Sequence, residues 1–191
     1  TPVGPHQSIT RMDGGWVLEI DKRPAWDVFK EYLDGDPEDL NAEGIVHLCI
    51  GTSANPSATF VGDPMIIRTP FALDKERGAL LFPGGGLVEG QRVRMTRRDA
   101  NRVRDTAISC AREILVGEDR APAFVLQFDC AGRGKVMFGG GAASTIIAPL
   151  RAEIGEGVPW AGFHTYGEIA PMGEALHYHN YTVALCAFYD A

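Results

Sequence analysis

The clearest periodic pattern in the chain lies between Asp99 and Gly117. Apolar residues recur there at positions 103, 107, 110, 111 and 114, which form one continuous stripe along a helix. Asp99 is a residue type that caps helix N-termini, and Gly117 is one that ends helices. The pattern therefore predicts a helix over residues 100–116.

Before this helix the pattern is mostly that of short strands. Alternating or continuous apolar runs predict strands at 16–20, 45–50, 65–69, 78–82 and 91–95. A helix is predicted to start at Pro24, because proline is favoured at a first helical position and Trp26, Phe29 and Leu33 share one face. A polar helical turn is predicted at 38–42 and a loop at 51–63.

After the helix, strands are predicted at 123–128, 160–163 and 176–189. A helix is predicted at 144–154, which Pro149 starts or kinks. Strands outnumber helices, and hairpin-length turns join several of them. The pattern predicts an α+β fold with mostly antiparallel sheets of about eight to nine strands, packed with three to four helices.

Two segments of different character complete the domain organisation. Residues 1–13 are rich in glycine and proline and carry no clear periodicity, which predicts a linker or arm. Residues 14–191 are predicted to form one domain, because 191 residues fit one core and no internal boundary or repeat is visible. Since the chain begins at Thr1 rather than Met, we expect it to be part of a longer protein or a processed one.

Composition and charge narrow the function class. The net charge of −7 argues against broad binding to nucleic acid or to anionic membranes. One local exception is the segment 91–104, which holds six arginines and one aspartate. It is interpreted either as solvated strand and helix faces or as a docking face for an acidic partner. No apolar run is long enough to span a bilayer, and no secretory signal is visible at the N-terminus.

The four cysteines form no close pair in sequence. Cys49, Cys110 and Cys186 lie in apolar periodic stretches and are expected to be small core residues. With no disulfide framework evident, a reducing, cytoplasmic location is expected.

Polar residues gather near the C-terminus, between residues 158 and 189. Glu168, His177, His179 and Asn180 lie within about a dozen residues of each other, flanked by aromatic and small residues. A few polar groups in an apolar wall are typical of a ligand pocket. His177 and His179 would share one face of a strand, and Glu168, Cys130 and His164 could add metal ligands, but the paired spacing of zinc sites is absent. We expect no metal and no cofactor.

Two functions can be considered for the segment 131–136, AGRGKV: a phosphate loop and a site that holds a carboxylate. It does not match a phosphate loop, because Asp129 and Val136 stand where that motif needs glycine and a hydroxyl. Arg133 could hold a ligand carboxylate, or the glycines could simply form a turn. Cys130, a histidine and Glu168 are also the residue types of a nucleophilic triad, although no nucleophile signature surrounds Cys130.

Several motifs together resemble the FIST domain family (F-box and intracellular signal transduction proteins), in its C-terminal half. They are GFHTYGEIAP at 162–171, HYHNYTVAL at 177–185, FDCAGRG at 128–134, DKRPA at 21–25 and EGQRV at 89–93. The resemblance runs from about residue 14 to the end of the chain. It implies a prokaryotic sensory domain that binds small ligands, with amino acids often proposed, and that passes the signal to an output module.

The resemblance also implies which residues form the site and which partners are expected. The family's motifs coincide with Tyr166, Gly167 and Glu168, with His179 and Asn180, and with Cys130 and Arg133. We expect these seven residues to bind an amino acid-like ligand, with Glu168 facing an ammonium or amide and Arg133 a carboxylate.

The expected partners are the N-terminal half of the FIST domain and a downstream or partner signalling module. No catalytic residue is assigned, and a non-enzyme is expected. The alternatives are a hydrolase or amidase that uses Cys130, and an interaction module that uses the arginine-rich segment 91–104.

Overall fold

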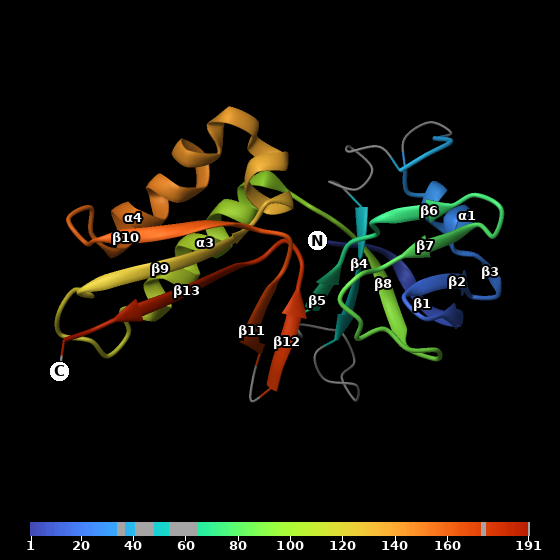
Figure 1. Ribbon diagram of the computed structural model, residues 1–191, viewed down its shortest axis with the longest axis horizontal. Coiled ribbons are helices and arrows are strands. Elements are labelled where there is room, and N and C mark those ends of the chain that lie inside the picture. The colour runs from blue at the N-terminus through green and yellow to red at the C-terminus, as the bar shows by residue number, and fades with distance from the viewer. Residues whose placement is uncertain (34–36, 41–47, 54–64, 173–174, 191) are drawn as a thin grey trace. The chain divides into compact units, whose positions relative to one another are not determined.

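The computed structural model describes residues 1–33, 37–40, 48–53, 65–172 and 175–190. The chain divides into two compact units (Figure 1). Unit 1 comprises Thr1–Arg98 with Pro171–Tyr178, and unit 2 comprises Asp99–Ala170 with His179–Ala191. The boundary after Arg98 carries no signal in the sequence pattern, which predicts one domain over 14–191.

Unit 1 is built on an eight-stranded sheet in which every described pair of strands is antiparallel. The strands are β1 (Pro2–Asp13), β2 (Trp16–Ile20), β3 (Arg23–Pro24), β4 (Leu48–Ser53), β5 (Met65–Arg68), β6 (Ala72–Asp74), β7 (Ala79–Leu81) and β8 (Arg92–Arg97). Their order is β5-β4-β8-β1-β2-β7-β6, with β3 paired to β2.

The prediction of a linker at residues 1–13 is wrong. The segment forms β1, which is twelve residues long and lies between β8 and β2 in the sheet. Its alternation is hidden because Gly4 adopts a positive φ of 72° and the register shifts between Val3 and His6. Beyond that irregularity Gln7 and Ile9 are buried, as alternate residues of a strand should be.

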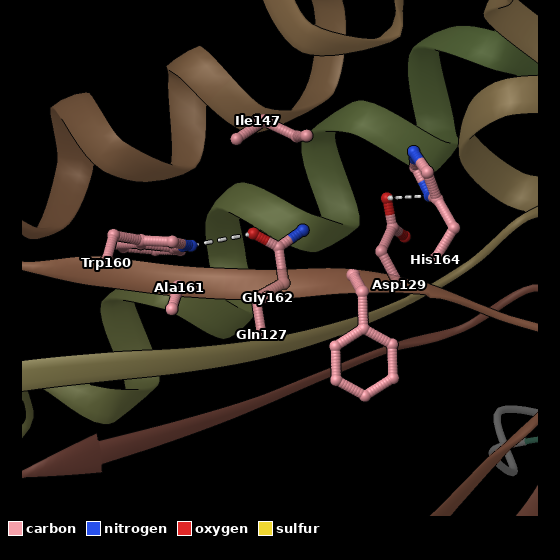
Figure 2. A pocket seen from close by; sticks show the side chains of 8 residues that line it. Gln127, Asp129, Ile147, Trp160, Ala161, Gly162 and His164 are labelled. Atoms are coloured by element: carbon pink, nitrogen blue, oxygen red, sulfur yellow. Dashed lines mark hydrogen bonds and ion pairs between the residues drawn. The ribbon is translucent and has the colours of Figure 1, made fainter.

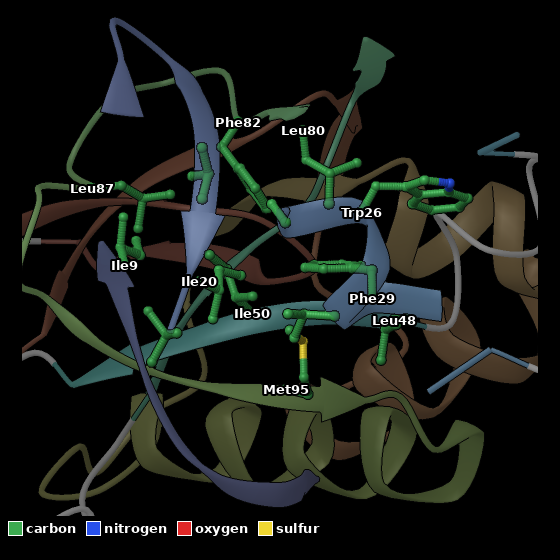
Figure 3. Close-up of a cluster of buried hydrophobic side chains, with 14 residues drawn as sticks. Ile9, Ile20, Trp26, Phe29, Leu48, Ile50, Leu80, Phe82, Leu87 and Met95 are labelled. Atoms are coloured by element: carbon green, nitrogen blue, oxygen red, sulfur yellow. The ribbon is translucent and has the colours of Figure 1, made fainter. Parts of the chain in front are cut away.

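A hydrophobic core fills unit 1 between the sheet and one short helix, α1 (Ala25–Lys30). Figure 3 shows Trp26 and Phe29 of this helix among strand side chains that include Ile20, Leu48 and Met95. The helix predicted to start at Pro24 begins one residue later, at Ala25, with Pro24 as its N-cap, and it ends at Lys30, before the predicted residue Leu33. The continuous apolar run at 45–50 enters the sheet as β4, with residues 45–47 outside the described part.

Unit 2 contains a three-stranded sheet covered on one face by two helices (Figure 1). Its central strand β9 (Phe124–Cys130) pairs in parallel with β10 (Trp160–Thr165) and antiparallel with β13 (Val183–Phe188). The helices are α3 (Ala100–Ile114) and α4 (Ala148–Ile154). Their core includes two alanines of α3, Ala107 and Ala111, whose small side chains let the helix approach Val125 of the sheet.

The predicted N-cap of the long helix is confirmed. The Asp99 carboxylate accepts a hydrogen bond from the Arg102 backbone amide at 2.8 Å. Between β9 and α4 the chain makes three short helical turns, η1 (Gly132–Val136), η2 (Gly139–Gly141) and η3 (Ala143–Ile147). Pro149 lies in the first turn of α4, so it starts this helix, which is one of the two alternatives predicted.

The strand predicted over 176–189 is broken in two. β12 (Ala175–His179) pairs with β11 (Glu168–Met172) in a separate two-stranded sheet, and β13 starts only at Val183. The break occurs because Tyr181 adopts a positive φ of 57°, which a continuous strand does not allow.

The mixed α+β class with mostly antiparallel pairing is confirmed, with thirteen strands in the part of the chain that is described. Of the helical turn predicted at 38–42, residues 38–40 are described and are not helical, and of the loop predicted at 51–63, residues 51–53 belong to β4; the remaining residues of both predictions lie outside the described part. None of the helices in the described ranges has the length and apolarity needed to cross a lipid bilayer.

Candidate functional site

The motif residues of the C-terminal third meet at the end of β9 in unit 2. The Cys130 backbone amide donates to the carbonyl of Thr182 at 3.1 Å, and the next amide, of Ala131, donates to the carbonyl of Thr165 at 2.7 Å. The end of β9 is thereby tied to the turn after β10 and to the turn before β13. The structure thus brings together the Cys130 motif, the Tyr166–Glu168 motif and the His179–Thr182 motif.

Two of the predicted binding residues hold these turns in place. The Asn180 side-chain amide donates to the carbonyl oxygen of Tyr166 at 3.2 Å. His179 is buried, and its Nε2 lies 3.2 Å from the carbonyl of Ala170, to which it can donate. Tyr166, by contrast, is 88% exposed.

Glu168 is a buried carboxyl group with one oxygen left without a partner. Its Oε1 accepts from the Thr165 hydroxyl, whereas Oε2 has no hydrogen-bond partner. Burial raises the pKa of Glu168 to about 7, and the bonds from Thr165 and from the Thr182 backbone oppose that rise. Near neutral pH this group can therefore either accept or donate a hydrogen bond.

Arg133 is engaged by an internal carboxylate. Its Nη1 lies 2.6 Å from Asp129 Oδ1, and both side chains are only 3% exposed. Its Nη2 donates to the carbonyl of Val103 at 3.3 Å. Burial raises the pKa of Asp129, while Arg133 and then His164 oppose the rise. Binding of a ligand carboxylate by Arg133, as predicted, would require exchange with Asp129.

Cys130 lacks the environment of a nucleophile. Burial and the neighbouring Glu168 raise the pKa of its thiol, against the opposing effect of nearby backbone amides. Nucleophilic cysteines need a lowered pKa, because the thiolate is the reactive form. A Cys130-dependent hydrolase therefore has little support in this geometry.

Metal binding is likewise unsupported by the described residues. Within those ranges no three His, Cys, Asp or Glu side chains lie close enough together to hold a metal ion. None of the four cysteines forms a disulfide bond; Cys49 is buried as predicted and Cys110 is half-buried, whereas Cys186 is exposed, so its prediction as a core residue is wrong.

A pocket lies along the helix-covered face of β9 and β10, beside the motif cluster. Trp160, Gly162 and His164 are alternate residues of β10, and in the parallel register Gly162 is paired with Gln127. A side chain cannot replace this glycine, because a Cβ would lie 2.3 Å from the Gln127 carbonyl oxygen. The glycine thus leaves open the space between Trp160 and His164.

The resulting pocket has a volume of about 210 Å³, and its lining includes the side chains of Gln127, Asp129, Ile147 and His164. In Figure 2 the Gln127 amide and the Asp129 carboxylate point into this space, with Ile147 above them and Trp160 on one side. Trp160 Nε1 donates to Gln127 Oε1 at 3.0 Å, which fixes the orientation of the amide.

Two buried polar atoms in this pocket have no hydrogen-bond partner. They are Gln127 Nε2, a donor, and Asp129 Oδ2, an acceptor, on side chains that are almost fully buried. The Nδ1 atom of His164 lies 3.9 Å from Asp129 Oδ2. Because a buried polar group without a partner costs about 1–3 kcal/mol, such atoms indicate a place where water or a ligand binds.

The sequence-based site did not include Gln127, His164 or Trp160. A signal for Gln127 was present: it lies between Val125 and Asp129 in an alternating strand, so it shares their inward face. Polar residues at core positions of a strand are candidates for a site.

Comparison with known proteins gives a family match. The model of the FIST C domain matches residues 25–171. An uncharacterized protein of Mycobacterium tuberculosis (strain ATCC 25618 / H37Rv) is 31% identical over 196 residues, which cover 99% of this chain and 49% of the relative. An uncharacterized protein of Mycobacterium bovis is 29% identical, over 99% of this chain and 48% of the relative. The chain thus spans about half the length of these relatives. No solved structure matches it.

Proposed function

Because this chain belongs to the FIST C domain family, a family of signal-transduction sensory domains, we propose that it is the part of a signalling protein that binds a small ligand. The observation that carries the proposal is the pocket on the helix-covered face of β9 and β10, with its unpaired donor on Gln127 and unpaired acceptor on Asp129. A small apolar space with a few convergent polar groups is the usual form of a ligand site.

The motif cluster has a supporting role in this proposal. Asp129 is followed directly by Cys130, whose amide bonds to the carbonyl of Thr182, and by Ala131, whose amide bonds to the carbonyl of Thr165. These bonds fix the end of β9 and therefore the position of Asp129. Glu168, which also has an unpaired oxygen, is buried and does not line the pocket. An amino acid-like ligand, a cytoplasmic location and a bacterial signalling partner belong to the same proposal.

The six arginines of the predicted docking face, residues 91–104, are divided between the two units. Arg92, Arg94, Arg97 and Arg98 belong to unit 1, whereas Arg102 and Arg104 belong to unit 2. Arg94 and Arg97 donate to the carbonyls of Gly4 and Tyr32, so these two guanidinium groups are already hydrogen-bonded within unit 1. An acidic partner for this segment stays a prediction, to be tested by binding that weakens with salt.

The test of ligand binding is a thermal-shift screen of the 191-residue chain against amino acids and small metabolites. A ligand at a hundredfold excess over its dissociation constant stabilises a folded unit by about 2.7 kcal/mol. For a chain of this size that corresponds to a shift of roughly 5–10 °C in the melting temperature.

A variant that narrows the pocket tests whether a rise in melting temperature comes from a ligand bound there. A Cβ at Gly134 would lie 2.8 Å from Asp129 Oδ2 and 3.0 Å from the His164 ring, so Gly134→Ala narrows the space between them. We expect hits that stabilise the wild type and fail to stabilise a folded Gly134→Ala chain. A screen without hits, or hits that are unaffected by this variant, would count against the pocket as the sensing site.

A further inference from the structure

The unpaired atoms of the pocket define what a ligand must supply. Gln127 Oε1 is occupied by Trp160, so that the residue presents only its Nε2 donor. Asp129 Oδ1 is occupied by Arg133, so that this residue presents only its Oδ2 acceptor. A ligand that satisfies both must accept one hydrogen bond and donate another.

Charge and size restrict the ligand further. The charge of Asp129 is already balanced by Arg133 at 2.6 Å, and among the described residues that line the pocket none is a lysine or arginine, whereas His164 lies 3.9 Å from Asp129 Oδ2. A ligand carboxylate would face Asp129 Oδ2 with no proton to donate. The volume of about 210 Å³ is below the roughly 300–1,000 Å³ of pockets for drug-sized molecules, which leaves space for about one ring.

We propose that this pocket binds a small uncharged ligand through a carboxamide or lactam group, whose carbonyl accepts from Gln127 and whose N–H donates to Asp129. This inference rests on the proposed sensory function and names the ligand class of the same site. The apolar part of the ligand lies against Trp160 and Ile147, which bound the pocket in Figure 2. Within this class the pocket favours a carboxamide over the matching carboxylic acid.

Three compounds of nearly equal shape test this pattern of donors and acceptors. Benzamide offers an acceptor and a donor, benzoate only acceptors, and benzamidine only donors. We expect benzamide to bind the wild-type chain at least tenfold more tightly than the other two, measured by NMR titration with the Trp160 indole N–H as reporter.

One substitution should reverse the preference. Gln127→Glu keeps the oxygen that accepts from Trp160 and replaces the free Nε2 donor with an acceptor. The variant should therefore bind benzamidine at least tenfold more tightly than benzamide. A residue with only a structural role would weaken all three compounds together, and circular dichroism confirms that the variant is folded. Gly134→Ala serves as the blocked control and should bind none of them.

The outcomes separate this inference from the proposed function. Equal or tighter binding of benzoate, or an unchanged order in Gln127→Glu, would overturn the carboxamide class. If none of the three compounds binds, but a metabolite from the screen binds the wild type and not Gly134→Ala, the carboxamide class would be overturned and the pocket would still be the sensing site. Failure of the compounds and of the metabolite screen together would overturn both.

Discussion

The buried ion pair of Arg133 and Asp129 gives the sharpest quantitative prediction about unit 2. Both side chains are 3% exposed and their charged atoms lie 2.6 Å apart, so that removing Arg133 leaves a carboxylate buried without its cation. Loss of one partner of a buried pair typically costs about 3–5 kcal/mol of unfolding free energy. We expect Arg133→Met to have this cost at pH 8 and a smaller cost as the pH is lowered, because burial raises the pKa of the Asp129 carboxyl and a protonated carboxyl needs no cation.

A second pair in the same unit provides the control. Arg112 and Glu153 are joined by bonds of 2.7 and 3.1 Å, but the arginine side chain is 64% exposed. Exposed pairs contribute about 0–1 kcal/mol, so that Arg112→Met should have little effect. The comparison tests burial, because the exposed pair has two bonds between its charged groups and the buried pair has one.

The assay is urea unfolding followed by circular dichroism, with hydrogen exchange of the β9 amides to assign the loss to unit 2. At a slope of about 1–3 kcal/mol per molar urea, Arg133→Met should lower the midpoint by at least about 1 M. The double variant with Asp129→Leu should recover much of this loss, because it removes both charges. A loss below 1 kcal/mol in Arg133→Met, or equal losses in the two arginine variants, would refute the reasoning.

Three further predictions concern the same unit. The folded-state pKa of Glu168 is about 7, above its ordinary value of 4.5, so the folded state holds an extra proton between these values and the unfolding free energy falls as the pH rises from about 4.5 to 7. In urea titrations, the difference in unfolding free energy between pH 5 and pH 8 should be roughly 1–3 kcal/mol smaller in Glu168→Gln than in the wild type, and an equal difference in both would contradict the raised pKa. Gly132→Ala places a Cβ 2.2 Å from the Tyr181 ring and should lower the unfolding free energy by about 1–3 kcal/mol. Gly140→Ala meets nothing within 4 Å and should leave the unfolding free energy nearly unchanged in the same urea titrations. Cys186 is exposed and Cys130 is buried with a raised thiol pKa, so mass spectrometry after brief alkylation at pH 7.5 should find Cys186 modified first; faster modification of Cys130 would revive the nucleophile hypothesis.

Local signals predicted much of the fold. The helix after Asp99 was correct and the start of α1 was correct to within one residue, because capping and periodicity act within a few residues. The strand β1 was missed because Gly4 interrupts its alternation, and its place in the sheet depends on distant strands. The break after His179 was missed because no residue type there demands a left-handed backbone, which Tyr181 nevertheless adopts.

The candidate site was predictable in part. Sequence motifs indicated that Cys130, Glu168 and Asn180 belong together, and the hydrogen bonds around the end of β9 join their segments. The motifs did not reveal that Arg133 would be balanced by Asp129, four residues away, because this depends on the helical turn after β9. The pocket depends on the pairing of Gly162 with Gln127 across two strands, which only the folded register shows.

The central claim is that a small ligand binds in the pocket formed by β9 and β10. The most direct measurement is an NMR titration of the 191-residue chain with the best compound of the thermal-shift screen, which follows the Gln127 side-chain amide and the Trp160 indole N–H. We predict that both signals shift with one saturating curve, while the indole signals of Trp16 and Trp26 in unit 1 stay unchanged. Saturable shifts confined to unit 1, with Gln127 and Trp160 unaffected, would contradict the account.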